Sequence, residues 1–177
     1  MATELDTNDL LDRLGHPDGA QRWKAYAELE GLGEEAASKL AIEMLSHPTW
    51  YVRRVAAIYA DHHPAPALLE RLKLARHDPK AKVRMFAVHS LSCEPCKPGG
   101  NPVDAVPFII RAMKEDKAPR VRRMAAVMLM LGAPEKRVVR AFHWVLENEG
   151  DEKVRRWATL GLERKSTEGS KRTNDES

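Results

Sequence analysis

A five-fold sequence repeat is the feature that most constrains the fold of this 177-residue chain. Each copy has an apolar or neutral residue followed by arginine, an alanine three residues after that arginine, and a leucine or alanine four residues further on. The arginines are Arg22, Arg53, Arg84, Arg122 and Arg155, so the steps between them are 31, 31, 38 and 33 residues. A period in the thirties is typical of solenoids, in which copies of a small unit stack on their neighbours.

Every copy predicts one core-facing helix. In the fourth copy, the apolar residues fall at positions i, i+3, i+4, i+7 and i+8, which lie on one face of a helix; they are Val121, Met124, Ala125, Met128 and Leu129. The small central alanine allows a neighbouring helix to approach closely. Residues that favour helix starts, such as Asp, Thr and Pro, come before most of these segments.

A second amphipathic segment precedes each core-facing helix. These segments are residues 9–14, 34–45, 66–76, 103–114 and 135–148. We therefore predict an all-α fold, an α-solenoid of about five antiparallel helix pairs over residues 1–163. The longest step between arginines contains a loop insertion at residues 93–101. The polar tail, residues 164–177, lacks periodicity and is expected to be disordered.

These motifs resemble the bacterial HEAT-like repeats of the lyase type. The residues that carry the resemblance are Asp78–Leu91 and Asp116–Leu131, where Asp, Val-Arg, Ala and Leu have the family spacing. The likeness extends over residues 10–163. It implies that the repeated arginine, here called the arginine ladder, reaches an acidic turn residue of its own or the adjacent repeat. The candidate acids are Asp18, Asp78, Asp116 and Asp151. We therefore interpret the ladder as structural.

The residue after each ladder arginine varies and is expected to be exposed. These residues are Trp23, Arg54, Met85, Arg123 and Arg156. Together with Lys80, Lys82, Lys117 and Arg120 in the adjoining turns, the arginines could form an electropositive surface on the core-facing helices. Such a surface would suit a phosphate backbone or an acidic protein. An ordinary solvated face is the alternative interpretation.

The net charge supports a charged partner only through its distribution. The whole chain carries +3, which is too mild to indicate nucleic-acid binding. Residues 1–63 carry −5, residues 64–133 carry +7 and residues 134–177 carry +1. The basic centre and acidic start could orient a charged partner along the stack.

The insertion contains the two cysteines of the chain, Cys93 and Cys96. A C-x-x-C pair can supply two zinc ligands, and His89 lies one helical turn earlier. However, a closed zinc site needs four ligands, and the sequence has no second C-x-x-C. Redox dithiols usually lie at a helix start, whereas this pair follows a helix. We therefore expect free thiols and no cofactor, with zinc at Cys93, Cys96 and His89 as the alternative.

The sequence contains no catalytic constellation that we recognise: no nucleophile–base pair, carboxylate dyad or phosphate-binding glycine loop. It lacks the His-Glu dipeptides of the HEAT-like di-iron hydroxylases and any motif specific to the bilin lyases. The HEAT-like alkylpurine DNA glycosylases use a basic concave surface with Trp and Asp around an extruded nucleotide. This chain has four tryptophans and a basic centre, so this enzyme class remains an alternative.

We therefore predict a noncatalytic HEAT-repeat scaffold that binds another macromolecule, in first place a protein, on its core-facing helices. The alternative is a nucleic-acid-binding solenoid with a basic central surface, extending to a glycosylase-like enzyme. The start of the sequence has no secretory pattern, and its longest apolar run, Ala125–Ala133, is about half of what a bilayer requires. We expect a monomeric, cytoplasmic protein without a membrane partner.

Overall fold

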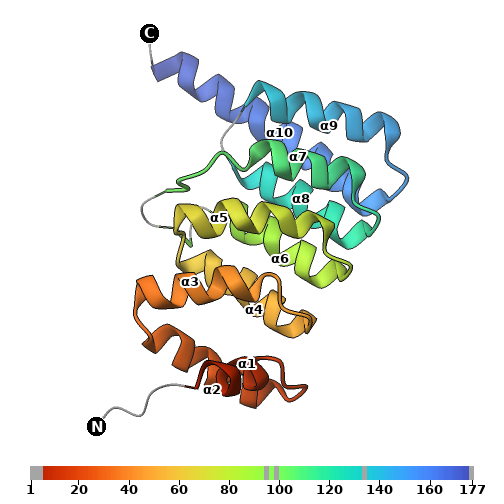
Figure 1. Ribbon diagram of the computed structural model, residues 1–177. Helices are drawn as coiled ribbons and strands as arrows, with labels where there is room; N and C mark the ends of the chain where they lie inside the picture. The colour runs from red at the N-terminus through yellow and green to blue at the C-terminus, as the bar shows by residue number, and fades with distance from the viewer. Residues whose placement is uncertain (1–5, 94–95, 98–99, 133–134, 176–177) are drawn as a thin grey trace.

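The protein is described by a computed structural model that covers residues 6–93, 96–97, 100–132 and 135–175. These residues form ten α-helices and one short 3-10 helix, and none of them lies in a β-strand, which confirms the all-α prediction. The elements drawn in Figure 1 are α1 (Thr7–Leu14), α2 (Gly19–Gly31), α3 (Glu34–Met44), α4 (Trp50–His62), α5 (Pro66–Leu72), η1 (Lys73–His77), α6 (Ala81–Ser92), α7 (Val106–Glu115), α8 (Pro119–Leu131), α9 (Lys136–Asn148) and α10 (Glu152–Asp175).

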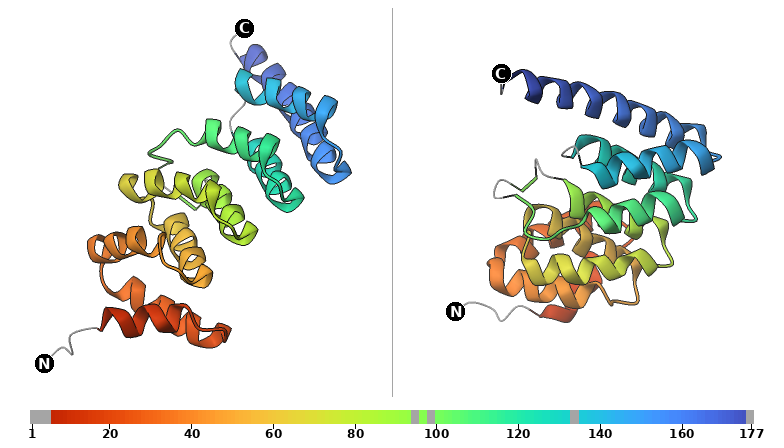
Figure 2. Two further views of the ribbon diagram at one scale, coloured as in Figure 1. Left: turned by 45° about the vertical axis from the view of Figure 1, so that its right-hand side comes forward. Right: turned by 90° about the horizontal axis from the view of Figure 1, so that it is seen from above.

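The helices are arranged as five consecutive pairs that stack in chain order. The two ends of the chain lie at opposite ends of the stack (Figure 1), and the stepwise succession of pairs is visible in Figure 2. Within the stack, α4, α6, α8 and α10 contact one another in series, and α3 contacts α5 as α7 contacts α9. We call the even-numbered helices the inner helices and the odd-numbered ones the outer helices. This arrangement confirms the predicted α-solenoid of about five pairs.

The core runs along the whole stack between the two layers. The repeat alanines are fully buried in every inner helix, as predicted; they are Ala25, Ala56, Ala87, Ala125 and Ala158. The valines that precede the ladder arginines are also fully buried; they are Val52, Val83, Val121 and Val154. Burial of each valine side chain stabilises the fold by roughly 1.5–3 kcal/mol. Because every pair buries its core against the next, the stack has one continuous apolar interior.

Two outer helices differ in length from the sequence-based prediction. α5 ends at Leu72, and the chain continues to His77 as the 3-10 helix η1. α7 begins at Val106, three residues after the predicted start, because the Asp104 carboxylate accepts a hydrogen bond from the Val106 N–H at 3.1 Å. Pro107 then occupies the first turn, where the missing N–H costs no helical hydrogen bond.

The C-terminal segment differs from the expectation of a disordered tail. α10 continues past Arg164 to Asp175. The first turns of α10 pack on α8 and α9, so the unfavourable nucleation step is already made, and the following residues contain no proline that would end the helix. Residues 176–177 of the tail, and residues 94–95 and 98–99 of the insertion, lie outside the described residues.

Candidate functional site

Three arginines of the ladder bridge consecutive helix pairs. Arg84 on α6 is the most buried of them, with 4% of its side chain exposed, and its Nε and Nη2 donate to the Asp116 carboxylate at 2.7 and 2.8 Å. Its Nη1 donates to the Asp78 backbone carbonyl in the turn of its own pair, at 2.8 Å. The equivalent contacts elsewhere are Arg53 with the Asp78 carboxylate and the His47 carbonyl, and Arg122 with the Glu149 carboxylate and the Asp116 carbonyl.

The residue that receives each ladder arginine also holds its own turn in shape. Asp116 Oδ1 accepts a hydrogen bond from the Ala118 N–H at 2.8 Å. In the same way, Asp78 accepts the Lys80 N–H and Glu149 accepts the Asp151 N–H, in each case from the residue two positions later. His16 and His47 occupy this position in the first two pairs, and the Nδ1 atom of each accepts the corresponding N–H. The two histidines are therefore turn residues.

The ends of the ladder lack an inter-repeat ion pair. His47 stands where a carboxylate would face Arg22, and the Arg22 guanidinium instead lies 4.4 Å from the centroid of the Tyr51 ring. Arg155, on the last helix, donates to the Leu146 carbonyl. The ladder guanidinium groups are thus engaged within the stack, which leaves the ladder little capacity to bind a partner.

Two of the four candidate acids are not ladder partners. Asp18 instead accepts a hydrogen bond from the Ala20 N–H at the start of α2. Arg122 reaches Glu149 and not Asp151, because Glu149 occupies the turn position equivalent to Asp78 and Asp116. Asp151 instead caps the start of α10 by accepting hydrogen bonds from the Lys153 and Val154 N–H groups at 3.0 and 3.1 Å. The two acids of this turn therefore have separate roles.

The Arg122–Glu149 pair makes stability depend on pH. The hydrogen bond from Arg122 lowers the pKa of Glu149 and raises that of Arg122. A carboxyl whose pKa is lower in the folded state stabilises the fold above its unfolded pKa, and this contribution is lost as the pH falls through the folded pKa. We expect the difference in unfolding free energy between the wild type and Glu149→Gln to shrink between about pH 7 and pH 3. Urea titrations at several pH values measure it.

A matched control for this prediction is Glu147→Gln, an exposed carboxylate on α9. Its unfolding free energy should stay close to that of the wild type at every pH. A Glu149→Gln effect that is the same at both pH values would contradict the linkage.

A second set of residues forms what we call the inner-helix face. It consists of the residues two before and one after each ladder arginine, which lie one turn apart on the same side of each inner helix. From α2 to α10 these are Ala20, Trp23, Tyr51, Arg54, Lys82, Met85, Arg120, Arg123, Lys153 and Arg156. Six of the ten are cations and none is an acid. Lys153 was missed by the sequence analysis, although the spacing that selects Lys82 and Arg120 also selects it.

The cations of this face differ in exposure. Lys82, Arg120, Lys153 and Arg156 are exposed. Arg54 is half-buried, its guanidinium lies 4.9 Å from the centroid of the Phe86 ring, and its Nε has no hydrogen-bond partner. Burial, followed by the nearby charge of Arg22, lowers the pKa of Arg54. This arginine lies in the part of the face where an anionic partner would gain most, because the charge is already partly desolvated.

Two other residues that the sequence analysis assigned to this face, Arg123 and Met85, make contacts within the protein. Arg123 Nε lies 3.9 Å from the Asp151 carboxylate and donates to the Pro119 carbonyl at 3.4 Å. Met85 is half-buried and packs against the core. Trp157, like Met85, packs against the core. Trp23 is the most exposed large apolar residue of the face, at 71%.

A shallow cavity of about 210 Å³ adjoins the middle of the inner-helix face. It is lined by Trp50, Lys80, Ala81, Lys82 and Arg120. The Lys82 ammonium lies 5.6 Å from the centroid of the Trp50 ring. Three cations and an aromatic ring thus surround a small opening without a carboxylate among its lining residues.

Comparison with known protein families identifies a repeat family that agrees with this architecture. The family model described as HEAT repeats matches residues 7–92 and 65–163, which together span most of the chain. The chain belongs to the HEAT-repeat family. One of the solved structures that share the fold is the crystal structure of an engineered protein, at 16% sequence identity and a TM-score of 0.55, covering 91% of this chain and 79% of that one. Comparison with curated proteins finds no match.

The HEAT-repeat match accounts for the ladder and the stack. In solenoids of this kind each unit contacts its neighbours, so the residues that repeat are those that position one unit on the next. The residues that do not repeat, such as those of the inner-helix face, are not required for stacking and can therefore vary to suit a binding partner. None of the helices in the described part of the chain has the length and apolar character that crossing a bilayer requires.

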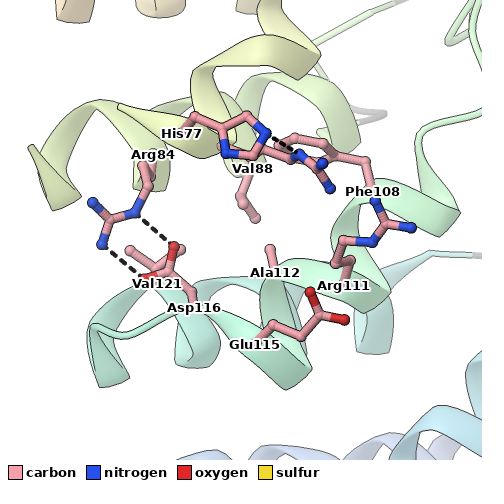
Figure 3. A pocket seen from close by; sticks show the side chains of 10 residues that line it. His77, Arg84, Val88, Phe108, Arg111, Ala112, Glu115, Asp116 and Val121 are labelled. Atoms are coloured by element: carbon pink, nitrogen blue, oxygen red, sulfur yellow. Dashed lines mark hydrogen bonds and ion pairs between the residues drawn. The ribbon is translucent and has the colours of Figure 1, made fainter. Parts of the chain in front are cut away.

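The HEAT-repeat stack also contains a cavity of about 240 Å³ between the third and fourth pairs. Figure 3 shows the Arg84–Asp116 pair on one side of it and Phe108 with Arg111 on the other. Charges of both signs line the cavity, with Glu115 beside Arg111. Three arginines and two carboxylates line it, and one arginine and one carboxylate are already paired with each other, so the lining has only a small excess of positive charge.

The insertion residues of this HEAT-repeat protein gather around a buried acid of α4. Cys93 Sγ and Cys96 Sγ lie 2.8 Å apart, and His89 Nδ1 lies 3.3 Å from Asp61 Oδ2. Lys97 is 2% exposed; its Nζ donates to the Cys93 carbonyl at 3.1 Å and lies 3.5 Å from Asp61 Oδ1. The structure thus brings together the three residues named from the sequence and adds Asp61 and Lys97.

The titratable groups of this cluster shift the pKa values of one another. The hydrogen bond with Cys93, burial, and the Asp61 carboxylate together raise the pKa of Cys96 to about 12. Burial alone would raise the pKa of Asp61, but His89, Cys96 and Lys97 outweigh it and lower that pKa. At neutral pH, Cys96 is therefore a thiol and Asp61 a carboxylate. No sequence pattern pointed to Asp61, because it lies at the end of the second helix pair, whereas Cys93 follows the third pair.

Proposed function

We propose that this protein is a noncatalytic HEAT-repeat adaptor that binds an acidic protein segment on its inner-helix face. The observation that carries the proposal is the composition of that face, which has six cations and no acid at its ten positions. Complementary charge steers a partner to such a surface and sets its orientation.

Apolar residues beside the cations favour a protein over a nucleic acid. One turn further along the inner helices, five residues after the ladder arginines, lie the half-buried side chains of Ile58, Val127 and Leu160. Protein interfaces are rich in arginine, methionine and aromatic residues around an apolar centre. An amphipathic acidic segment would place carboxylates on the cations and apolar side chains on this second row.

Charge reversal of three of the exposed cations tests the proposal. The triple variant Lys82→Glu, Arg120→Glu, Arg156→Glu should weaken binding of a fluorescent acidic amphipathic peptide by about ten- to a hundredfold, since each exposed pair contributes up to roughly 1 kcal/mol. Fluorescence anisotropy at low and moderate salt measures the affinity. These three side chains are exposed, so the fold should be preserved.

The matched control carries the same charge change on the outer layer. Arg76→Glu, Arg111→Glu, Arg140→Glu alters three exposed arginines of η1, α7 and α9. It should leave peptide binding within about twofold of the wild type, apart from the general effect of net charge. Equal losses in the two triple variants, or no peptide binding by the wild type, would contradict the proposal.

Nucleic-acid binding is the second candidate, and the cavity at Trp50 favours it. An aromatic ring with Lys80, Lys82 and Arg120 around it could stack a base and hold its phosphate. Anisotropy with single-stranded and duplex DNA, measured beside the peptide, compares the two classes of partner. Binding to DNA that falls steeply with salt and is lost in Trp50→Ala would favour this candidate. A glycosylase-like reaction would further require a carboxylate, which the cavity lining does not supply.

A further inference from the structure

The two cysteines of the chain lie against the end of a neighbouring pair. Cys93 follows α6 directly, and Asp61 and His62 are the last two residues of α4. Asp61 is 6% exposed, so its carboxylate lies inside the protein. A buried carboxylate needs partners that satisfy its charge. The side chains around it are two thiols, two imidazoles and one ammonium group.

The donor atoms of this cluster lie close to one another. One oxygen of Asp61, one nitrogen of His89 and the sulfur of Cys93 are within 4.8 Å of one another. The corresponding atoms of Asp61, His62 and Cys96 also fall within 4.8 Å. Because the two sulfurs are 2.8 Å apart, the two triads share one small volume. In a tetrahedral zinc site, with zinc about 2.3 Å from sulfur and about 2.0 Å from nitrogen, ligand atoms are roughly 3–4 Å apart. Zinc binding therefore requires the two sulfurs to move apart by about 1 Å.

We propose that Cys93, Cys96, His89 and Asp61 bind a single zinc ion. Thiolate sulfur, imidazole nitrogen and carboxylate oxygen are the donors that zinc takes in proteins, and four of them close the coordination sphere. His89 is the fourth ligand in preference to His62 because it is less exposed, 31% against 57% of its side chain, and lies nearer to Asp61 Oδ2, at 3.3 Å against 3.9 Å. A closed site of this kind is structural.

The charge balance of the cluster fits a divalent cation. Zinc replaces the two thiol protons, which leave to solvent, so two S–H bonds are exchanged for two Zn–S bonds and the net charge of the cluster is unchanged. Zinc, two thiolates and one carboxylate carry one negative charge together. The buried Lys97 ammonium, 3.5 Å from Asp61 Oδ1, supplies the one positive charge that neutralises it.

The location gives the site a structural consequence. The insertion lengthens the step between the third and fourth ladder arginines, and a longer loop costs more conformational entropy to order. Ligands from the end of α4, the end of α6 and the insertion would tie this loop to two consecutive helix pairs. We expect zinc to stabilise the middle of the stack, next to the basic inner-helix face.

Cobalt spectroscopy of the full chain tests the proposal. Protein that has been reduced and freed of metal is titrated with Co²⁺ and then with Zn²⁺. The expected result is one Co²⁺ per chain, a thiolate-to-cobalt charge-transfer band in the near ultraviolet and the intense visible bands of tetrahedral Co²⁺, all abolished by one equivalent of Zn²⁺. Zn²⁺ should also raise the melting temperature. This measurement uses the wild-type chain, so it does not depend on the folding of a variant.

Variants then identify the ligands. Cys93→Ser, Cys96→Ser and His89→Gln should each weaken Co²⁺ binding by at least about tenfold. The control His62→Gln should change it less than about threefold, because its imidazole lies outside the proposed coordination sphere. The proposal is overturned if reduced wild-type protein shows no thiolate-to-cobalt band, if the Cys93→Ser, Cys96→Ser double variant binds Co²⁺ as tightly as the wild type, or if His62→Gln and not His89→Gln abolishes binding.

Discussion

Replacing Arg84 with methionine is expected to lower the free energy of unfolding by about 3–5 kcal/mol, the range for removal of one partner from a buried ion pair. The Asp116 carboxylate, whose side chain is 8% exposed, would lose both hydrogen bonds from Arg84 and remain buried without its counter-charge. Methionine preserves most of the aliphatic stem, so the effect reports the charge and not the packing. Urea denaturation followed by circular dichroism measures the change.

The control is the same substitution at the first interface. No carboxylate faces Arg22, because His47 occupies that position, so Arg22→Met should cost only about 1–2 kcal/mol through lost hydrogen bonds and the contact with Tyr51. Adding Asp116→Asn to Arg84→Met should recover part of the loss, since the amide oxygen can still accept the Ala118 N–H. Equal effects of Arg84→Met and Arg22→Met would show that the inter-repeat ion pair contributes nothing to stability.

The second large effect concerns the contact between α9 and α10. A Cβ atom added at Gly161 would lie 2.5 Å from Cε2 of Phe142, and the Phe142 ring is fully buried. Overpacking in Gly161→Ala should therefore lower the unfolding free energy by about 1–3 kcal/mol. The higher helix propensity of alanine should offset roughly 1 kcal/mol of this loss. Phe142→Ala should cost about 3–5 kcal/mol because it leaves a cavity.

The double variant of this pair distinguishes a steric clash from a general loss of stability. In Phe142→Ala, Gly161→Ala the new methyl group enters the space that the ring vacated, so the combined cost should be smaller than the sum of the two single costs. Gly31→Ala is the control, because a Cβ there would meet nothing within 4 Å. It should be neutral or stabilising by up to about 1 kcal/mol. Additive effects at Gly161 and Phe142 would contradict the close approach of the two helices.

Much of the scaffold could be predicted from residues close together in sequence. Helix formation depends on a spacing of three or four residues, so the amphipathic pattern around Val121 and its equivalents was sufficient to predict the inner helices and their buried alanines. The position of the arginine relative to the turn six residues earlier is also local. For this reason the sequence placed Arg53 and Arg84 in the ladder, next to the turns whose carbonyls they contact. That turn acids receive them followed from the resemblance to HEAT-like repeats and not from local spacing, because Asp78 and Asp116 lie 25 and 32 residues further along the chain.

Contacts between pairs were less predictable. The turn before α10 contains both Glu149 and Asp151, and composition alone does not distinguish the ladder partner from the helix cap. The stacking of Arg54 on Phe86 depends on the rotation of α4 relative to α6. The start of α7 depended on whether the Asp104 carboxylate accepts the Val106 N–H, and the continuation of α10 on the packing of its first turns.

By itself, the sequence determined that the chain is a stack of helix pairs, because a repeated local pattern forms the same local unit wherever it occurs. The tertiary structure decided which side chains meet between units. Cys93, Cys96 and His89 formed an incomplete set in the sequence, and stacking α4 against α6 placed the buried Asp61 beside them. It also aligned the exposed cations of separate helices into one face. Both outcomes depend on the register between units, which is set by side-chain packing across the whole interface and not by any short segment.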